Sequence, residues 1–68
     1  MIKINELKGE IIKAGYTQTS LAREIGISPK SFYSKMKKGI FNSNEIDAMI
    51  GLLRIQDPVS IFFAKKVS

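Results

Sequence analysis

The sequence predicts an all-α protein, a compact bundle of five short helices forming one domain over residues 1–68. Apolar residues recur at spacings of three and four along the chain, which is the period of an amphipathic helix. Ser, Thr, Asn or Asp precede several of these segments, and both prolines stand where a helix would begin. A chain of 68 residues supports one small core and leaves no room for a second domain.

The first helix is expected near the start of the chain, from an N-cap at Asn5 to about Ala14. Leu7, Ile11 and Ala14 share one side at helical spacing and would form its buried face. Gly15 follows directly and would end the helix.

The middle of the chain predicts two short helices joined by a tight turn. Thr17 is a good N-cap for a helix that starts at Gln18, because its hydroxyl can accept a hydrogen bond from an early amide. Gly26 can adopt the left-handed conformation that ends a helix. Ser28 would cap the next helix, and Pro29 would fill its first position, where a missing amide costs nothing.

The second helix of this pair is expected to have one buried face and one basic face. Phe32 and Met36 share a side at about 100° per residue. The other side carries Lys30, Ser31, Ser34, Lys37 and Lys38. No Asp or Glu occurs between residues 25 and 44. Lysines neutralise phosphates and small polar side chains allow close approach to base edges, so this pattern suits a major-groove helix. Taken alone, a basic amphipathic helix is more often a solvated surface, and the caps and glycine turn before it are what favour DNA contact.

Two further helices are expected toward the C-terminus. The fourth would run from about Ser43 to Leu53, behind an N-cap at Asn42 that forms a capping box with Glu45. Asp57 and Pro58 together predict the start of the fifth, as cap and first residue. The buried arc of this last helix is expected to contain Val59, Phe62, Phe63 and Val67.

Three apolar residues fall outside the faces that a single core would use. Ala48 and Leu52 lie on a second strip of the fourth helix, and Ile61 points away from the buried arc of the fifth. They predict a protein interface, in a symmetric homodimer or with a partner protein.

Composition excludes several classes of function. The chain has no Cys and no His, which rules out a disulfide framework, zinc fingers and Ser-His-Asp or Cys-His catalysis. The six carboxylates are scattered and are expected on helix surfaces or in caps, so no enzyme activity, metal or cofactor is predicted. A net charge of +5 and a pI near 9.8 favour a nucleic-acid partner.

No apolar run approaches the ~18 residues that a membrane span requires. The polar start of the chain does not look like a signal peptide. A cytoplasmic protein of a bacterial host cell, without membrane contact, is expected.

The most specific signal is the order of caps, turn and basic helix, carried by Thr17-Gln18, Leu21-Ala22, residues 25–28 and residues 32–39. These segments resemble the helix-turn-helix of the lambda-repressor and Cro-like family, small regulators of bacteria and their phages. Residues 61–64 also resemble the ends of short proteins from temperate phages of Gram-positive bacteria.

The resemblance implies that the second helix of the motif enters the major groove and the first lies across the backbone. By matched position it assigns DNA contacts to Gln18, Ser28, Pro29, Lys30, Ser31, Tyr33, Ser34, Lys37 and Lys38. Gln18 would donate to a phosphate, and Lys30 would read a guanine or hold a phosphate. Lys37 and Lys38 would hold phosphates beyond the groove edge, whereas Lys35 faces sideways and receives no role.

The predicted base-reading tip departs from the family pattern. Relatives often carry Gln, Asn or Arg there, which make bidentate base contacts, whereas this chain has Pro29, Lys30 and Ser31. This departure implies weak direct readout, reliance on DNA shape, or a motif retained mainly for another purpose. The leading hypothesis is a phage-type transcriptional regulator that binds operator DNA as a Cro-like dimer. The alternative is an antirepressor or modulator that binds a partner repressor protein.

Overall fold

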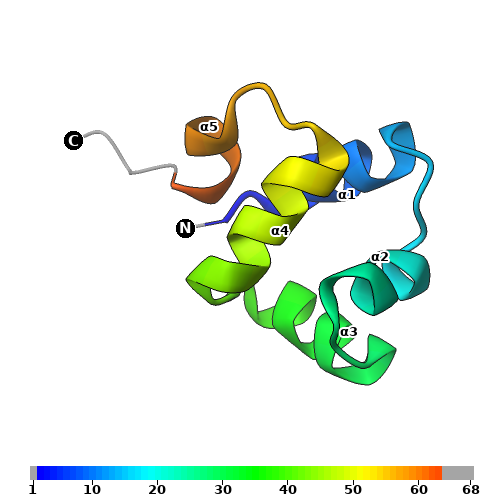
Figure 1. The fold of residues 1–68 in the computed structure, drawn as a ribbon. Coiled ribbons are helices and arrows are strands. Elements are labelled where there is room, and N and C mark those ends of the chain that lie inside the picture. Colours follow the sequence, from blue (N-terminus) through cyan, green and yellow to red (C-terminus); the bar gives the residue numbers. More distant parts are fainter. Residues whose placement is uncertain (1, 64–68) are drawn as a thin grey trace.

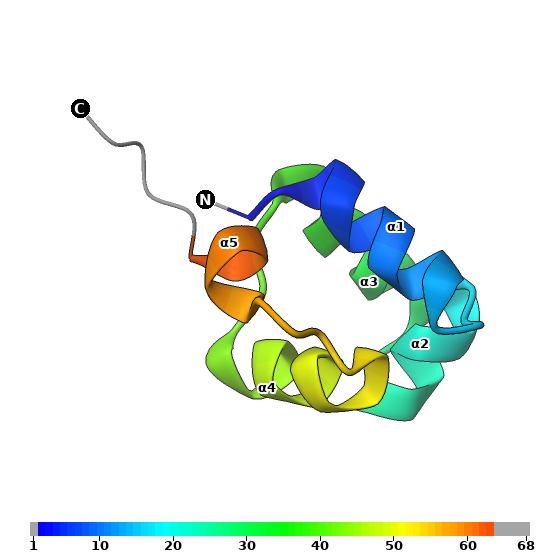
Figure 2. The ribbon, with the colours of Figure 1, turned by 90° about the horizontal axis from the view of Figure 1, so that it is seen from above.

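A computed structural model describes residues 2–63 of the chain, and within them it contains five helices and no strand. The helices are α1 (Ile4–Lys13), α2 (Gln18–Ile25), α3 (Pro29–Lys38), α4 (Ser43–Leu53) and α5 (Pro58–Phe62). α2 packs against both α3 and α4, and α5 packs against α1 (Figure 1, Figure 2). The predicted all-α fold is therefore confirmed for the described residues.

The core takes side chains from all five helices. Its most deeply buried large members are Leu7, Ile11, Leu21, Phe32 and Met49. Phe32 of α3 packs on Phe41 of the following loop, with ring centroids 5.5 Å apart and a tilt of 56°. This is a favourable geometry for an aromatic pair, and it attaches the inner side of α3 to the loop before α4.

α2 begins and ends where the sequence predicts, and α3 begins where it predicts. Thr17 Oγ1 accepts from the Ser20 amide at 3.0 Å, and Ser20 Oγ accepts from the Thr17 amide at 2.9 Å, a reciprocal capping box. Gly26 ends α2 with φ 86°, in the left-handed region that costs glycine little. Ser28 Oγ accepts from the Ser31 amide at 3.2 Å and so caps α3.

α1 starts differently from the prediction. Asn5 lies inside the helix, and the N-cap is Lys3, whose side chain makes no capping hydrogen bond. The Lys3 amide instead donates to the Ile61 carbonyl at 2.8 Å, and the N-terminal end of the described chain lies beside α5 in both views (Figure 1, Figure 2). A tertiary contact thus sets where this helix starts, and the local sequence does not reveal that contact. Ala14, expected on the buried face, is exposed at the helix end.

α4 has its predicted bounds and its predicted cap. Asn42 Oδ1 accepts from the Glu45 amide at 2.8 Å, and Glu45 Oε1 accepts from the Asn42 amide at 2.9 Å. Arg54 ends the helix in the left-handed conformation, with φ 52°, where glycine is the usual residue. The predicted start of α5 is also confirmed, since Asp57 Oδ1 accepts from the Ser60 amide at 3.3 Å.

The rotation of α5 about its own axis was predicted wrongly. Ile61 is buried, with 6% of its surface exposed, whereas Val59 and Phe63 are 62% and 51% exposed. Phe62 is buried as expected, and Val67 lies outside the described residues. A helix of five residues is too short for its own periodicity to define a face. Its packing on α1 and the hydrogen bond from Lys3 decide which side turns inward.

Candidate nucleic-acid interface

The outer side of α3 carries most of the residues expected to contact DNA. Ser28, Lys30, Ser31, Ser34, Lys37 and Lys38 are all exposed. Pro29 is half-buried, and Phe32 and Met36 on the opposite side belong to the core. Because the chain has no Asp or Glu between residues 25 and 44, the helix itself contributes only positive charge to this surface.

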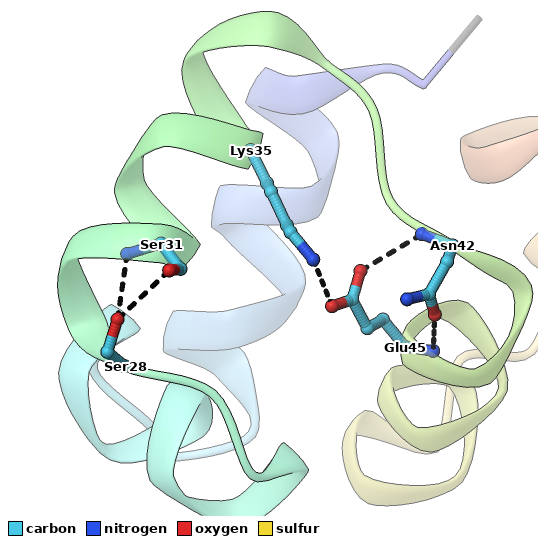
Figure 3. A network of polar contacts seen from close by, with 5 residues as sticks. All are labelled: Ser28, Ser31, Lys35, Asn42 and Glu45. Atoms are coloured by element: carbon cyan, nitrogen blue, oxygen red, sulfur yellow. Dashed lines mark hydrogen bonds and ion pairs between the residues drawn. The ribbon is translucent and has the colours of Figure 1, made fainter.

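At the start of α3, the hydroxyl of Ser28 caps the helix and the hydroxyl of Ser31 can donate outward. The Ser28 hydroxyl accepts from the Ser31 amide and donates its proton to Ser31 Oγ at 3.0 Å (Figure 3). Ser31 Oγ is the acceptor in this pair, so its own proton stays available for an outside acceptor. Ser31 and the exposed Lys30 are therefore the donor groups at this end of the helix, and Ser28 serves as the cap.

Tyr33 joins α3 to α2 at the surface. It is 50% exposed, and its hydroxyl lies 3.1 Å from Thr19 Oγ1 on α2, within hydrogen-bond distance. Thr19 was not among the residues predicted from the sequence, because nothing local relates a first-turn threonine of one helix to a tyrosine on the next. This contact helps to set the angle between the two helices.

An open groove of about 450 Å³ lies where α1, α2 and α3 meet. It is lined by Ile4, Lys8, Gln18, Tyr33, Met36 and Lys37. The groove brings together three of the predicted contact residues, Gln18 from α2 with Tyr33 and Lys37 from α3. Lys30, Ser34 and Lys38 lie outside it. Lys8 is an addition from α1 that sequence reasoning missed.

Lys35 is directed toward α4, away from the exposed lysines of α3. Its ammonium forms an ion pair with Glu45 Oε2 (Figure 3). The Glu45 side chain is only 7% exposed, and its other oxygen accepts from the Asn42 amide. One carboxylate thus caps α4 and also holds α3. The sequence predicted the cap, but the burial of Glu45 and its pairing with Lys35 depend on how the two helices pack.

The surroundings of Glu45 favour its charged form. Burial by itself would raise the pKa of Glu45, but the hydrogen bonds from Lys35 and the Asn42 amide, with the Lys35 charge, lower it further than burial raises it. The pKa therefore lies below its ordinary value. A carboxyl with a lowered folded-state pKa stabilises the fold above its unfolded-state pKa, and this contribution disappears as pH falls through the folded-state pKa.

We expect Glu45→Gln to destabilise the protein at neutral pH and to differ less from the parent in acid. The parent loses the charged carboxylate on acidification, whereas the variant has none to lose. Urea unfolding at pH 7 and at about pH 3 measures both free energies. Asp47→Asn, which neutralises an exposed carboxylate of the same helix, is the matched control and should change little. A Glu45→Gln penalty of equal size at both pH values would contradict the assigned role.

The three residues predicted as a protein interface separate in the structure. Ala48 and Leu52 of α4 are half-buried, and Leu52 packs against the core. Ile61 is a core residue, so its predicted place in an interface is wrong. The exposed apolar side chains at this end of the chain are Val59 of α5 and Phe63 directly after it, residues that the sequence assigned to the core.

A second open groove, of about 540 Å³, lies between α1 and the chain that connects α4 to α5. Its charged lining residues are Glu6, Glu10, Lys13, Arg54 and Asp57. Within residues 2–63, no group of three or more His, Cys, Asp or Glu residues is placed to hold a metal ion. The groove presents charges of both signs, unlike the uniformly basic surface of α3.

No family model, curated protein or solved structure matches this chain. In the part of the chain that the structure describes, no helix combines the length and apolar character needed to cross a membrane. The fold and the candidate site together define a small all-α protein that exposes one basic helix, α3, fixed on its inner side to α2, α4 and the loop between α3 and α4.

Proposed function

We propose that this protein is a phage-type transcriptional regulator of the lambda-repressor and Cro-like kind, with α2 and α3 as its helix-turn-helix. The observation that carries the proposal is the outer surface of α3, which is exposed, basic and free of carboxylates, and follows a glycine turn after α2. In such a complex α3 would enter the major groove while α2 lies across the backbone.

The two ends of α3 would then have different tasks. Lys30 and Ser31 at its start would face base edges, with Ser31 donating the proton that its contact with Ser28 leaves available. Lys37 and Lys38 at its end would hold phosphates, which position a protein on DNA without selecting sequence. An ammonium is a point charge and lacks the bidentate geometry of arginine, so part of the selectivity would come from DNA shape.

The test is a binding titration against duplex DNA from upstream of the protein's own gene, beside a scrambled duplex, at two salt concentrations. Tighter binding to the native duplex that persists at the higher salt supports a sequence-reading regulator. Weak binding that is equal for both duplexes and is abolished by modest salt would show that only charge is read. That result would reject operator recognition.

We expect Lys30→Ala to remove about 1–3 kcal/mol of discrimination between native and scrambled duplex, because a specific base contact is lost. Lys30→Arg is the matched control, since a guanidinium can make the same guanine contact with two hydrogen bonds and should retain discrimination. The ratio of the two dissociation constants, measured for each variant, is the readout. An unchanged ratio in Lys30→Ala would remove Lys30 from the base-reading role.

A second candidate function is that of an antirepressor, which binds a repressor protein instead of DNA. It is favoured by the exposed Val59 of α5 and Phe63 directly after it, together with the half-buried Ala48 and Leu52 on α4. A complex with the repressor from the same locus that survives nuclease treatment would support it. Loss of that complex on nuclease treatment would show that DNA bridges the two proteins.

A further inference from the structure

The charged residues of α1 are sorted onto two sides of the helix. Glu6, Glu10 and Lys13 line the groove toward α5, whereas Lys8 lines the groove toward α2 and α3. Ile4 and Lys8 are one helical turn apart, so they share the side that faces α3. Lys8 is exposed and lies on the same groove as Lys37. α1 therefore adds a positive charge beside the basic surface of α3.

We propose that Lys8 of α1 and Lys37 of α3 together hold one backbone phosphate of duplex DNA in this groove. The inference rests on the proposed function and extends it, because a third helix then takes part in DNA contact. The ligand is a phosphodiester carried by a DNA strand that runs past the C-terminal half of α3.

Three features of the groove suit a phosphodiester. Its two charged lining residues are both lysines, from different helices, and none of its lining residues is acidic. An anion bound between two ammonium groups reduces the repulsion between their positive charges. Uncharged neighbours do not reduce it. Gln18 and Tyr33 on the same groove add neutral amide and hydroxyl groups that can donate to phosphate oxygens.

The base of the groove strengthens this preference. Met36 is buried and Ile4 half-buried, so apolar surface lines the groove together with the two lysines. Charge contacts beside apolar surface are less screened than those in open water. The groove is open, as contact with a continuous strand requires.

The experiment measures duplex affinity as a function of salt for the full chain and for Lys8→Ala. The logarithm of the association constant falls linearly with the logarithm of the salt concentration, and loss of one phosphate contact should make this slope shallower by about 0.9. That change corresponds to roughly an eightfold loss of affinity at 0.1 M salt. Native and scrambled duplexes should lose affinity alike, because a phosphate contact carries no sequence information. Lys8→Arg, which keeps the charge, should restore the slope.

Lys13→Ala is the matched control, because it removes the same charge from the same helix but on the side of the other groove. Its slope should equal that of the parent. Equal losses in Lys8→Ala and Lys13→Ala would show an effect of net charge alone and overturn the inference. Thermal unfolding of both variants verifies that each one folds.

The further inference and the proposed function can fail separately. If Lys37→Ala and Lys38→Ala flatten the salt slope but Lys8→Ala does not, the regulator proposal stands and the shared phosphate site is wrong. If the parent protein binds no duplex at all, both are wrong. Inorganic phosphate that shifts the NMR signals of Lys8 and Lys37, without any effect of Lys8→Ala on duplex binding, would assign the groove to free phosphate and overturn the inference.

Discussion

Phe32→Ala is expected to remove a large part of the protein's free energy of unfolding. Phe32 has no exposed surface and packs on Phe41 at a ring distance of 5.5 Å. Truncation of a buried Phe to Ala costs about 3–5 kcal/mol. A domain of this length has roughly 3–10 kcal/mol of stability in total, at about 0.05–0.15 kcal/mol per residue. Circular dichroism during urea unfolding measures the loss.

Ile12→Ala provides the control for this experiment. Ile12 is also a large apolar side chain on a helix, but 75% of its surface is exposed. Its truncation should change the free energy of unfolding by no more than about 0.5 kcal/mol. If Phe32→Ala cost as little as Ile12→Ala, the placement of Phe32 at the centre of the core would be wrong. Phe32→Leu, which fills part of the same space, keeps the comparison measurable if the alanine variant does not fold.

The double variant Lys37→Ala with Lys38→Ala is expected to show the largest loss of DNA affinity. Both lysines are exposed at the end of α3, where the proposed complex brings phosphates. Loss of two phosphate contacts should make the salt slope shallower by about 1.8, which corresponds to roughly 60-fold weaker binding at 0.1 M salt. The ratio between native and scrambled duplex should stay constant. Fluorescence anisotropy over a salt series measures both quantities.

A second double variant separates local contact from net charge. Lys3→Ala with Lys13→Ala also removes two positive charges, one at the N-cap of α1 and one at its last residue, and neither residue lines the groove beside α3. Its salt slope should remain close to that of the parent. A salt slope in the α3 variant that matches the parent would rule out phosphate contacts by Lys37 and Lys38.

The structure explains why the outer side of α3 is left available. The helix is held by three contacts, none of which uses Lys30, Lys37 or Lys38. Phe32 packs on Phe41, Lys35 pairs with Glu45, and Tyr33 reaches Thr19 on α2. Lys35 is therefore the one lysine of this helix that takes part in holding it, and the other three project from its exposed surface.

Helix bounds were largely predictable because the signals that set them are local. The Thr17, Ser28 and Asn42 caps each bond to an amide three residues along the chain. The left-handed glycine at Gly26 likewise ends its helix through bonds to residues only a few positions back. Such contacts can be recognised from spacing alone. The basic face of α3 followed from the same helical period.

Where the prediction failed, a distant contact had replaced the local one. Asn5 would be an acceptable cap, but α1 begins earlier because the Lys3 amide donates to Ile61, which is far away in the sequence. Ile61 itself is buried because α5 rotates to pack on α1. A helix of five residues offers too few positions for its hydrophobic pattern to predict that rotation.

The sequence by itself determined the all-α class, the helix ends other than the start of α1, and the separation of α3 into a buried and a basic side, since each depends on groups within about one helical turn. Only the tertiary structure decided which side chains meet across helices. Thr19 and Tyr33 are 14 positions apart, and Lys35 and Glu45 are 10 apart. Lys8 reaches the groove beside Lys37 only because α1 packs next to α3. Such meetings depend on how helices cross, which the packing of the whole core decides.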